Sequence, residues 1–116
     1  MSTALENRVT LLGHLGQDVE LRELATGKKL ARFSVATNEF RRSAEGAPEK
    51  TTTWHNLVAW DQLAQSISEK LRKGSKVMIE GKIAYRQYET QSGEKRNMTE
   101  IVVSAFRKLD KDPHVA

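Results

Sequence analysis

Aromatic side chains stand beside polar or basic residues at several separated places in this chain. Phe40, for example, is followed directly by Arg41 and Arg42. The four aromatics in such settings are Phe40, Trp54, Trp60 and Tyr88. A ring face can stack on a base while a neighbouring cation neutralises a phosphate, which is what a flexible single strand of nucleic acid requires. Because a duplex hides its base faces, the pattern indicates binding to single strands.

Length and charge set the scale of the molecule. The chain has 116 residues, which is enough for one domain with a single modest core. Lysine and arginine number 19 against 15 acidic residues, giving a net charge of +4. This mild excess permits a polyanionic partner but does not demonstrate one, because a solvated surface can be basic for solubility alone.

Several classes of protein are disfavoured by what the sequence lacks. It has no cysteine, and therefore no disulfide framework or thiolate metal site. The first residues show no basic segment followed by an apolar one, so we expect no secretory signal. No apolar run approaches the ~18 residues that span a bilayer, so we expect no membrane partner. The expected setting is the cytoplasm, and we expect no cofactor and no metal, since the histidines lack metal-ligand spacing.

Hydrophobic alternation predicts a chain made mostly of strands. Residues 30–37 alternate through Ala31, Phe33 and Val35, which is the period of a half-buried strand. The predicted strands are residues 7–14, 18–24, 30–37, 51–60, 76–88 and 97–106. Residues 41–50 are polar and contain glycine and proline, which predicts a long, mobile hairpin loop. Residues 26–29 and 90–95 are predicted turns.

One helix is predicted between the strands at 51–60 and 76–88. Asp61 is a good N-cap residue, and an apolar stripe follows at Leu63, Ile67 and Leu71. Cations fill the last turn, where they favour the helix dipole. Gly74 stands where a left-handed residue would end the helix.

The order of these elements predicts an all-β OB-fold over residues 1–110. Such a fold is a five-stranded antiparallel barrel with one α-helix between strands 3 and 4. The glycines at 13, 16 and 81 then fit as bends or bulges of the barrel. Another small β-barrel, or an α+β sheet, is the structural alternative. Residues 111–116 are predicted to form a short C-terminal extension without an acidic tip.

Five stretches of the chain resemble segments of bacterial single-stranded DNA-binding proteins. They are residues 7–9 together with 12–18, then 33–39, 53–58, 71–77 and 79–83. They lie in the order that an OB-fold requires and cover roughly residues 5–109. A collinear set of this kind is far more specific than any single motif.

The resemblance implies binding and protection of single-stranded DNA in bacterial replication, recombination and repair, close to the nucleoid. It implies a homotetramer of OB-folds, with a homodimer or paired double-OB chains as alternatives, and it places His55 near a subunit interface. The four aromatics fall at the family's base-stacking positions, where Phe40 and Tyr88 replace tryptophans. The matching phosphate-side cations are Arg8, Arg72, Lys73 and Arg86. Arg41 and Arg42 lie in the predicted long loop, where we expect them to act as a mobile clamp on the phosphates.

The chain departs from this family at its end. Members usually continue into a Gly/Pro/Gln-rich linker and an acidic, hydrophobic tip that recruits other proteins, whereas this sequence ends in residues 110–116 without either. We therefore expect no tail-mediated protein partners. A tailless accessory copy, a domain cut at its boundary and a primosomal relative all fit this ending.

Structural readings compete with the functional ones at several residues. From its pattern alone, Trp54 is as consistent with a core position as with stacking, and Trp60 could pack on the helix stripe. Arg72 and Lys73 could simply balance the helix dipole. The resemblance favours the stacking role for the aromatic residues.

Two other functional classes remain alternatives. No phosphate-binding loop, zinc-protease helix or nucleophile elbow occurs in the sequence, and its acidic residues are dispersed, so we do not expect an enzyme. A primosomal or RNA-binding OB-fold interaction module is the other alternative. It predicts weak DNA binding or a preference for RNA, whose 2′-hydroxyls add contacts.

Overall fold

The computed structural model describes residues 5–109, so the predicted extension at 111–116 lies outside the described residues. A short 3-10 turn, η1 (Leu5–Asn7), precedes the first strand. The elements that follow are β1 (Val9–Leu15), β2 (Glu20–Glu23), β3 (Lys29–Arg42), β4 (Pro48–Trp60), α1 (Asp61–Lys70), β5 (Lys76–Glu89) and β6 (Lys95–Leu109). The predicted strand order and the single helix are confirmed.

Five of the strands close into a barrel, which confirms the predicted OB-fold. Their order is β1-β5-β6-β4-β3, and β1 also pairs with β3, so the sheet returns to its starting strand. The short strand β2 lies outside this ring and pairs antiparallel with the beginning of β3. The barrel pairs are antiparallel except where β4 meets β6, since Leu57 and Val58 pair in parallel with Ile101 and Val102.

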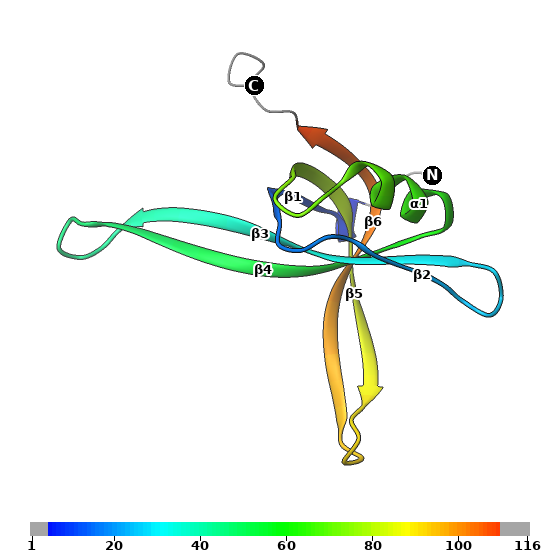
Figure 1. Cartoon of the computed structure of the whole chain (residues 1–116). Helices are drawn as coiled ribbons and strands as arrows, with labels where there is room; N and C mark the ends of the chain where they lie inside the picture. Colours follow the sequence, from blue (N-terminus) through cyan, green and yellow to red (C-terminus); the bar gives the residue numbers. More distant parts are fainter. Residues whose placement is uncertain (1–4, 110–116) are drawn as a thin grey trace.

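Two long hairpins extend from the barrel as separate arms (Figure 1). The predicted loop at 41–50 is wrong in extent, because β3 runs to Arg42, β4 begins at Pro48, and these two residues are paired. The ladder continues because the turn satisfies its own backbone: Ser43 N–H donates to the Ala47 carbonyl over 2.8 Å. The second arm is β5–β6.

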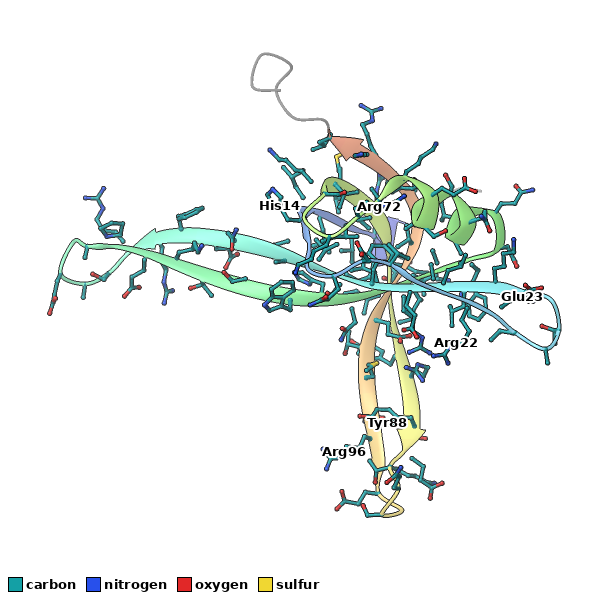
Figure 2. The ribbon with its side chains drawn as sticks, in the orientation of Figure 1. His14, Arg22, Glu23, Arg72, Tyr88 and Arg96 are labelled. Carbon is teal, nitrogen blue, oxygen red and sulfur yellow. The ribbon has the colours of Figure 1, made fainter. Side chains whose placement is uncertain are left out.

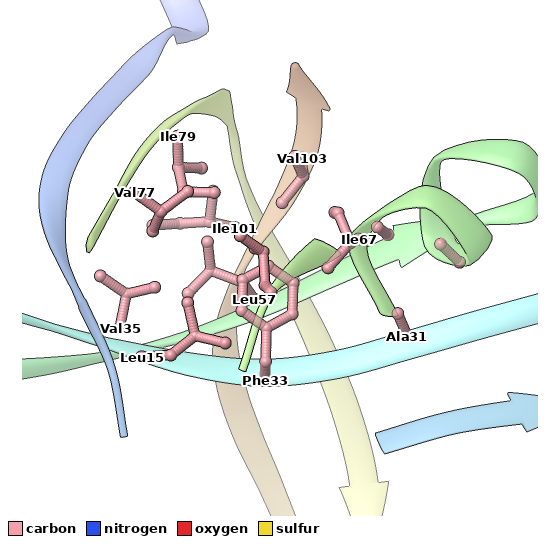
Figure 3. Packing of buried hydrophobic residues seen from close by; sticks show 13 residues of the cluster. Leu15, Ala31, Phe33, Val35, Leu57, Ile67, Val77, Ile79, Ile101 and Val103 are labelled. Carbon is pink, nitrogen blue, oxygen red and sulfur yellow. The ribbon is translucent and has the colours of Figure 1, made fainter. Parts of the chain in front are cut away.

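The barrel core is built from alternate positions of the strands (Figure 3). Val35, Leu57 and Ile79 come from three different strands and are at most 1% exposed. Helix α1 closes one end of the core with Ala64 and Ile67, both fully buried. Burial of this apolar surface is the main stabilising term of such a domain, at roughly 25 cal/mol per Å².

The helix ends differ from those predicted. Asp61 is the first helical residue and not the N-cap; its φ is +57° and no side chain caps the helix. The helix stops at Lys70 because Leu71 turns extended and buries its side chain in the core. Gly74 is therefore not the C′ residue. It lies in the next turn, where Ser75 N–H donates to the Arg72 carbonyl over 2.9 Å.

Gly81 occupies the predicted bulge. The β5–β6 register shifts between Glu80 and Gly81, and a Cβ at position 81 would overlap the Val102 carbonyl oxygen. Only glycine allows the two backbones to approach this closely. Within the part of the chain that the structure describes, no helix is long and apolar enough to cross a membrane.

Candidate nucleic-acid interface

The outer face of β3 and β4 carries three of the four predicted aromatics. Trp54 is paired with Ala36, Trp60 with Leu30, and Phe40 with Lys50. Directly opposed residues point to the same face of a sheet, and positions two apart share that face. The core residues Leu57 and Ala59 take the other positions of β4. Trp54 and Trp60 are therefore roughly 20 Å apart along one outer face.

The exposure of Trp54 shows that this residue does not belong to the core. Its exposed fraction is 59%, against 73% for Phe40, 41% for Trp60 and 39% for Tyr88. All four rings keep surface that a base could cover, and none belongs to the hydrophobic core cluster. A single exposed aromatic side chain is common on protein surfaces and needs no explanation. Three exposed aromatic side chains on one face of a sheet instead indicate a surface suited to binding.

Trp54 and Tyr88 meet at one open hollow between the two arms. The hollow has a volume of about 380 Å³, and both rings line it. Asn56, Asn97 and Met98 also line it. Tyr88 lies near the outer end of the β5–β6 arm (Figure 2), on the face shared by its partner Arg96. The parallel contact between β4 and β6 brings the two arms together here.

The other two aromatics lie away from this hollow. Phe40 lines a separate hollow of about 440 Å³ near the tip of the β3–β4 arm, with Arg41 and Arg42. Trp60 lies at the opposite end of the outer face, directly before α1. The structure thus brings Trp54 and Tyr88 together and leaves Phe40 and Trp60 further along the same strands.

Most of the predicted phosphate-side cations have partners within the chain. Arg8 pairs with Glu80. Arg41 lies 3.7 Å from Glu49, and Arg86 lies 3.1 Å from Glu100. The pairs of Arg8 and Arg41 are partly or mostly exposed and therefore weak, at ~0–1 kcal/mol, so a phosphate can compete for these two cations. The Arg86 pair differs, because its carboxylate partner is buried.

Arg72 and Lys73 follow the end of α1 but differ in their contacts. The Arg72 guanidinium donates to the carbonyls of Ser68, Glu69 and Leu71 over 3.0–3.3 Å, so it satisfies the helix end. The Lys73 backbone N–H donates to Asp18 over 2.7 Å. Among residues 5–109, no ion pair is formed by Lys73 or Arg42. Of the predicted cations, Lys73 and Arg42 therefore have the fewest charged or hydrogen-bonding partners for their side chains among the described residues.

His55 lies on the opposite face of β4 from Trp54. It is half-buried, and its Nε2 is 2.9 Å from the Thr37 hydroxyl. It also lines the hollow that Trp54 and Tyr88 share. Residues 5–109 contain no group of three or more His, Cys, Asp or Glu side chains placed to hold a metal ion.

Three further residues near this surface were not predicted from the sequence. Arg32 lies on the outer face of β3, opposite Val58, and Glu100 is a buried carboxylate on β6. Strand alternation from Trp54 could have identified Arg32. Tyr85 is 77% exposed, but it is three residues from Tyr88 and so faces the other side of β5.

Comparison with known proteins identifies relatives over nearly the whole chain. Single-stranded DNA-binding protein 1 of Chlorobaculum tepidum is 40% identical over 104 residues, covering 89% of this chain and 64% of that relative. The chain therefore spans slightly less than two thirds of the length of this relative.

Solved structures show the same fold. The SSB of Plasmodium falciparum, solved in complex with ssDNA, superposes with a TM-score of 0.82 at 33% identity, covering 95% of this chain and all of that one. A deletion mutant of the single-stranded DNA binding protein from Thermus aquaticus gives a TM-score of 0.79 at 21% identity, covering 90% of this chain and 50% of that chain. The model of the single-strand binding protein family matches residues 6–109. The chain therefore belongs to the single-strand binding protein family.

Proposed function

We propose that this protein binds single-stranded DNA without sequence specificity and protects it during replication, recombination and repair. The observation that carries the proposal is the meeting of Trp54 and Tyr88, from two separate arms, at one open hollow. Two exposed rings from different strands offer stacking surfaces that a single strand can cross in one pass. Membership of the single-strand binding protein family supports binding rather than catalysis.

The mechanism is electrostatic capture followed by stacking. Cations such as Arg42 and Lys73 attract the phosphates, and the bases then stack on the outer-face rings and on Tyr88. Each stacked base contributes ~1–3 kcal/mol. Each phosphate neutralised lowers the logarithm of the affinity by about 0.7 per decade of salt. The spacing from Trp60 to Phe40 along β3 and β4 offers a track for several nucleotides.

The protein acts as a homo-oligomer in this proposal, with a homotetramer as the assembly and a homodimer as the alternative. His55 is the residue we assign to the subunit interface; it is half-buried and lies on the opposite face of β4 from Trp54, although it also borders the hollow that Trp54 and Tyr88 line. In this proposal the protein acts in the bacterial cytoplasm, where it binds exposed single strands of DNA in association with the nucleoid. Sedimentation of the native protein and of His55→Ala measures the assembly and tests this role.

The decisive experiment is a titration of tryptophan fluorescence. Oligo(dT) should quench the emission of Trp54 and Trp60, a duplex of equal length should change it little, and higher salt should weaken the binding. Absence of quenching at low salt would mean that neither tryptophan contacts the strand. A competing RNA oligonucleotide of matched sequence separates the RNA-binding alternative, which requires RNA to displace DNA at equal concentration.

A further inference from the structure

The Arg86 guanidinium is held along one edge by two side chains of the facing strand β6. Its Nε and Nη2 donate to Glu100 Oε2 over 3.3 and 3.1 Å, and Nη2 also lies 3.4 Å from Met98 Sδ. The N–H bonds of a guanidinium lie in its plane, so partners that accept from them lie at its edge and not over its faces. The Arg86 side chain is 39% exposed. The contacts therefore fix this flat group while part of it stays open to a ligand.

The charge of Arg86 is balanced within the chain. The Glu100 side chain is only 9% exposed, and among residues 5–109 Arg86 is its one ion-pair partner. A buried carboxylate that loses its cation is costly, because its charge is then neither solvated nor paired. A phosphate that drew Arg86 away would leave Glu100 in this state. Arg86 therefore suits the neutral face of a base better than it suits a phosphate.

Arg86 also lies beside the hollow that Trp54 and Tyr88 share. Arg86 and Tyr88 are two positions apart on β5, so they lie on one face of the β5–β6 arm, roughly 7 Å apart along the strand. Met98 is paired with Arg86 and lines the hollow together with both rings. A single strand that stacks on Tyr88 therefore passes next to the guanidinium.

We propose that Arg86 offers its guanidinium face for stacking by a base, and that Glu100 is the positioning residue that holds and neutralises it. The proposal rests on the proposed function of single-stranded DNA binding. Guanidinium planes stack on ring systems and attract their π-faces. Every base has a π-face, so the contact is independent of sequence. This role differs from the phosphate contact that the family resemblance implies for Arg86.

The first test is an oligo(dT) titration of Arg86→Lys by tryptophan fluorescence. Lysine keeps a positive charge opposite Glu100 but has no flat group to stack on. We expect the affinity to fall about two- to fivefold. Arg107→Lys makes the same exchange at an exposed position near the other end of β6 and should leave the affinity unchanged. Native affinity in Arg86→Lys would overturn the proposal, because a positive charge alone would then be sufficient.

The second test measures the dependence of affinity on salt in Glu100→Gln. The glutamine carbonyl still accepts from Arg86, but the charge of the guanidinium is no longer balanced. Arg86 can then neutralise a phosphate, so we expect the log–log slope to become steeper by about 0.7. Glu89→Gln removes a carboxylate at an exposed position of β5 and should leave the slope unchanged. A purely structural role for Glu100 would not change the slope either, and an unchanged slope in Glu100→Gln would overturn its assignment.

Arg86→Gln keeps the proposal testable if Glu100→Gln does not fold. It removes a cation whose charge is already balanced, so the slope should stay that of the native chain. A slope shallower by about 0.7 would show that Arg86 neutralises a phosphate, and it would overturn the stacking role. These outcomes leave single-strand binding itself intact. Failure of the native chain to bind oligo(dT) would instead overturn the proposed function.

Discussion

Gly16 lies against the far edge of the Trp54 ring. A Cβ atom at position 16 would overlap this edge and stand 2.9 Å from Cη2. Glycine directly after β1 therefore leaves room for this edge of the ring, while 59% of the Trp54 side chain stays exposed. The backbone between β1 and β2 thus lies close to the Trp54 ring, so a side chain at position 16 would move the ring.

Gly16→Ala should displace the Trp54 ring and weaken single-strand binding without unfolding the domain. The obstacle is the far end of a side chain that can rotate, so the backbone need not move. We expect a loss of up to the ~1–3 kcal/mol that one stacked base contributes, measured by oligo(dT) titration. Gly81→Ala is the contrast: its Cβ meets the Val102 carbonyl, so it should lower the thermal unfolding temperature.

Trp54→Ala should weaken oligo(dT) binding by ~1–3 kcal/mol while the thermal unfolding temperature changes little. The reason is that the ring is mostly exposed and lies outside the core cluster. Leu57→Ala on the same strand changes a residue that is 1% exposed and should lower the free energy of unfolding by ~2–5 kcal/mol. Collapse of the fold in Trp54→Ala would return this tryptophan to a structural role.

Tyr88→Leu should reduce affinity for single strands, and Tyr85→Leu should not. The two tyrosines lie on one strand, but only Tyr88 lines the hollow with Trp54. Leucine keeps apolar volume and removes the flat ring, so the loss of stacking is isolated from the loss of bulk. Equal losses in both variants would show that the strand passes over both faces of the β5–β6 arm.

Arg42→Ala should flatten the dependence of affinity on salt by about 0.7 in the log–log slope. Arg42 shares a strand face with Phe40 and forms no ion pair within the described residues. Arg41 faces the other way and lies 3.7 Å from Glu49, so Arg41→Ala should change the slope less. Titrations at four salt concentrations measure both slopes, and a larger effect at Arg41 would contradict this assignment.

Arg86→Ala should lower the free energy of unfolding by about 1–3 kcal/mol, because it leaves the Glu100 carboxylate buried without its partner. Arg96→Ala removes a similar contact, to Glu94, that is exposed on both sides, and it should change stability by less than about 0.5 kcal/mol. Chemical denaturation measures both. The salt slope of Arg86→Ala separately tests the prediction that Arg86 also neutralises a phosphate.

Local pattern was sufficient to predict the strands and the helix, whereas the stacking role of the aromatic residues was predicted from the resemblance to a family. Alternation at Ala31, Phe33 and Val35 has the two-residue period of a strand, and the stripe from Leu63 to Ile67 has that of a helix. These periods are properties of neighbouring residues, so they can be read without knowledge of the fold. The helix ends were less predictable, because burial of Leu71 in the core ended α1 before Gly74.

The sequence by itself determined the barrel order, the helix and the positions of the exposed rings. Only the tertiary structure decided that Trp54 and Tyr88 share one hollow, that Arg86 is held by Glu100, and that the ladder of β3 and β4 continues to Arg42 and Pro48. The first two relationships depend on the contact of β4 with β6, which joins segments far apart in the chain. This contact forms only when the whole barrel closes, so the periodicity of neighbouring residues cannot predict it.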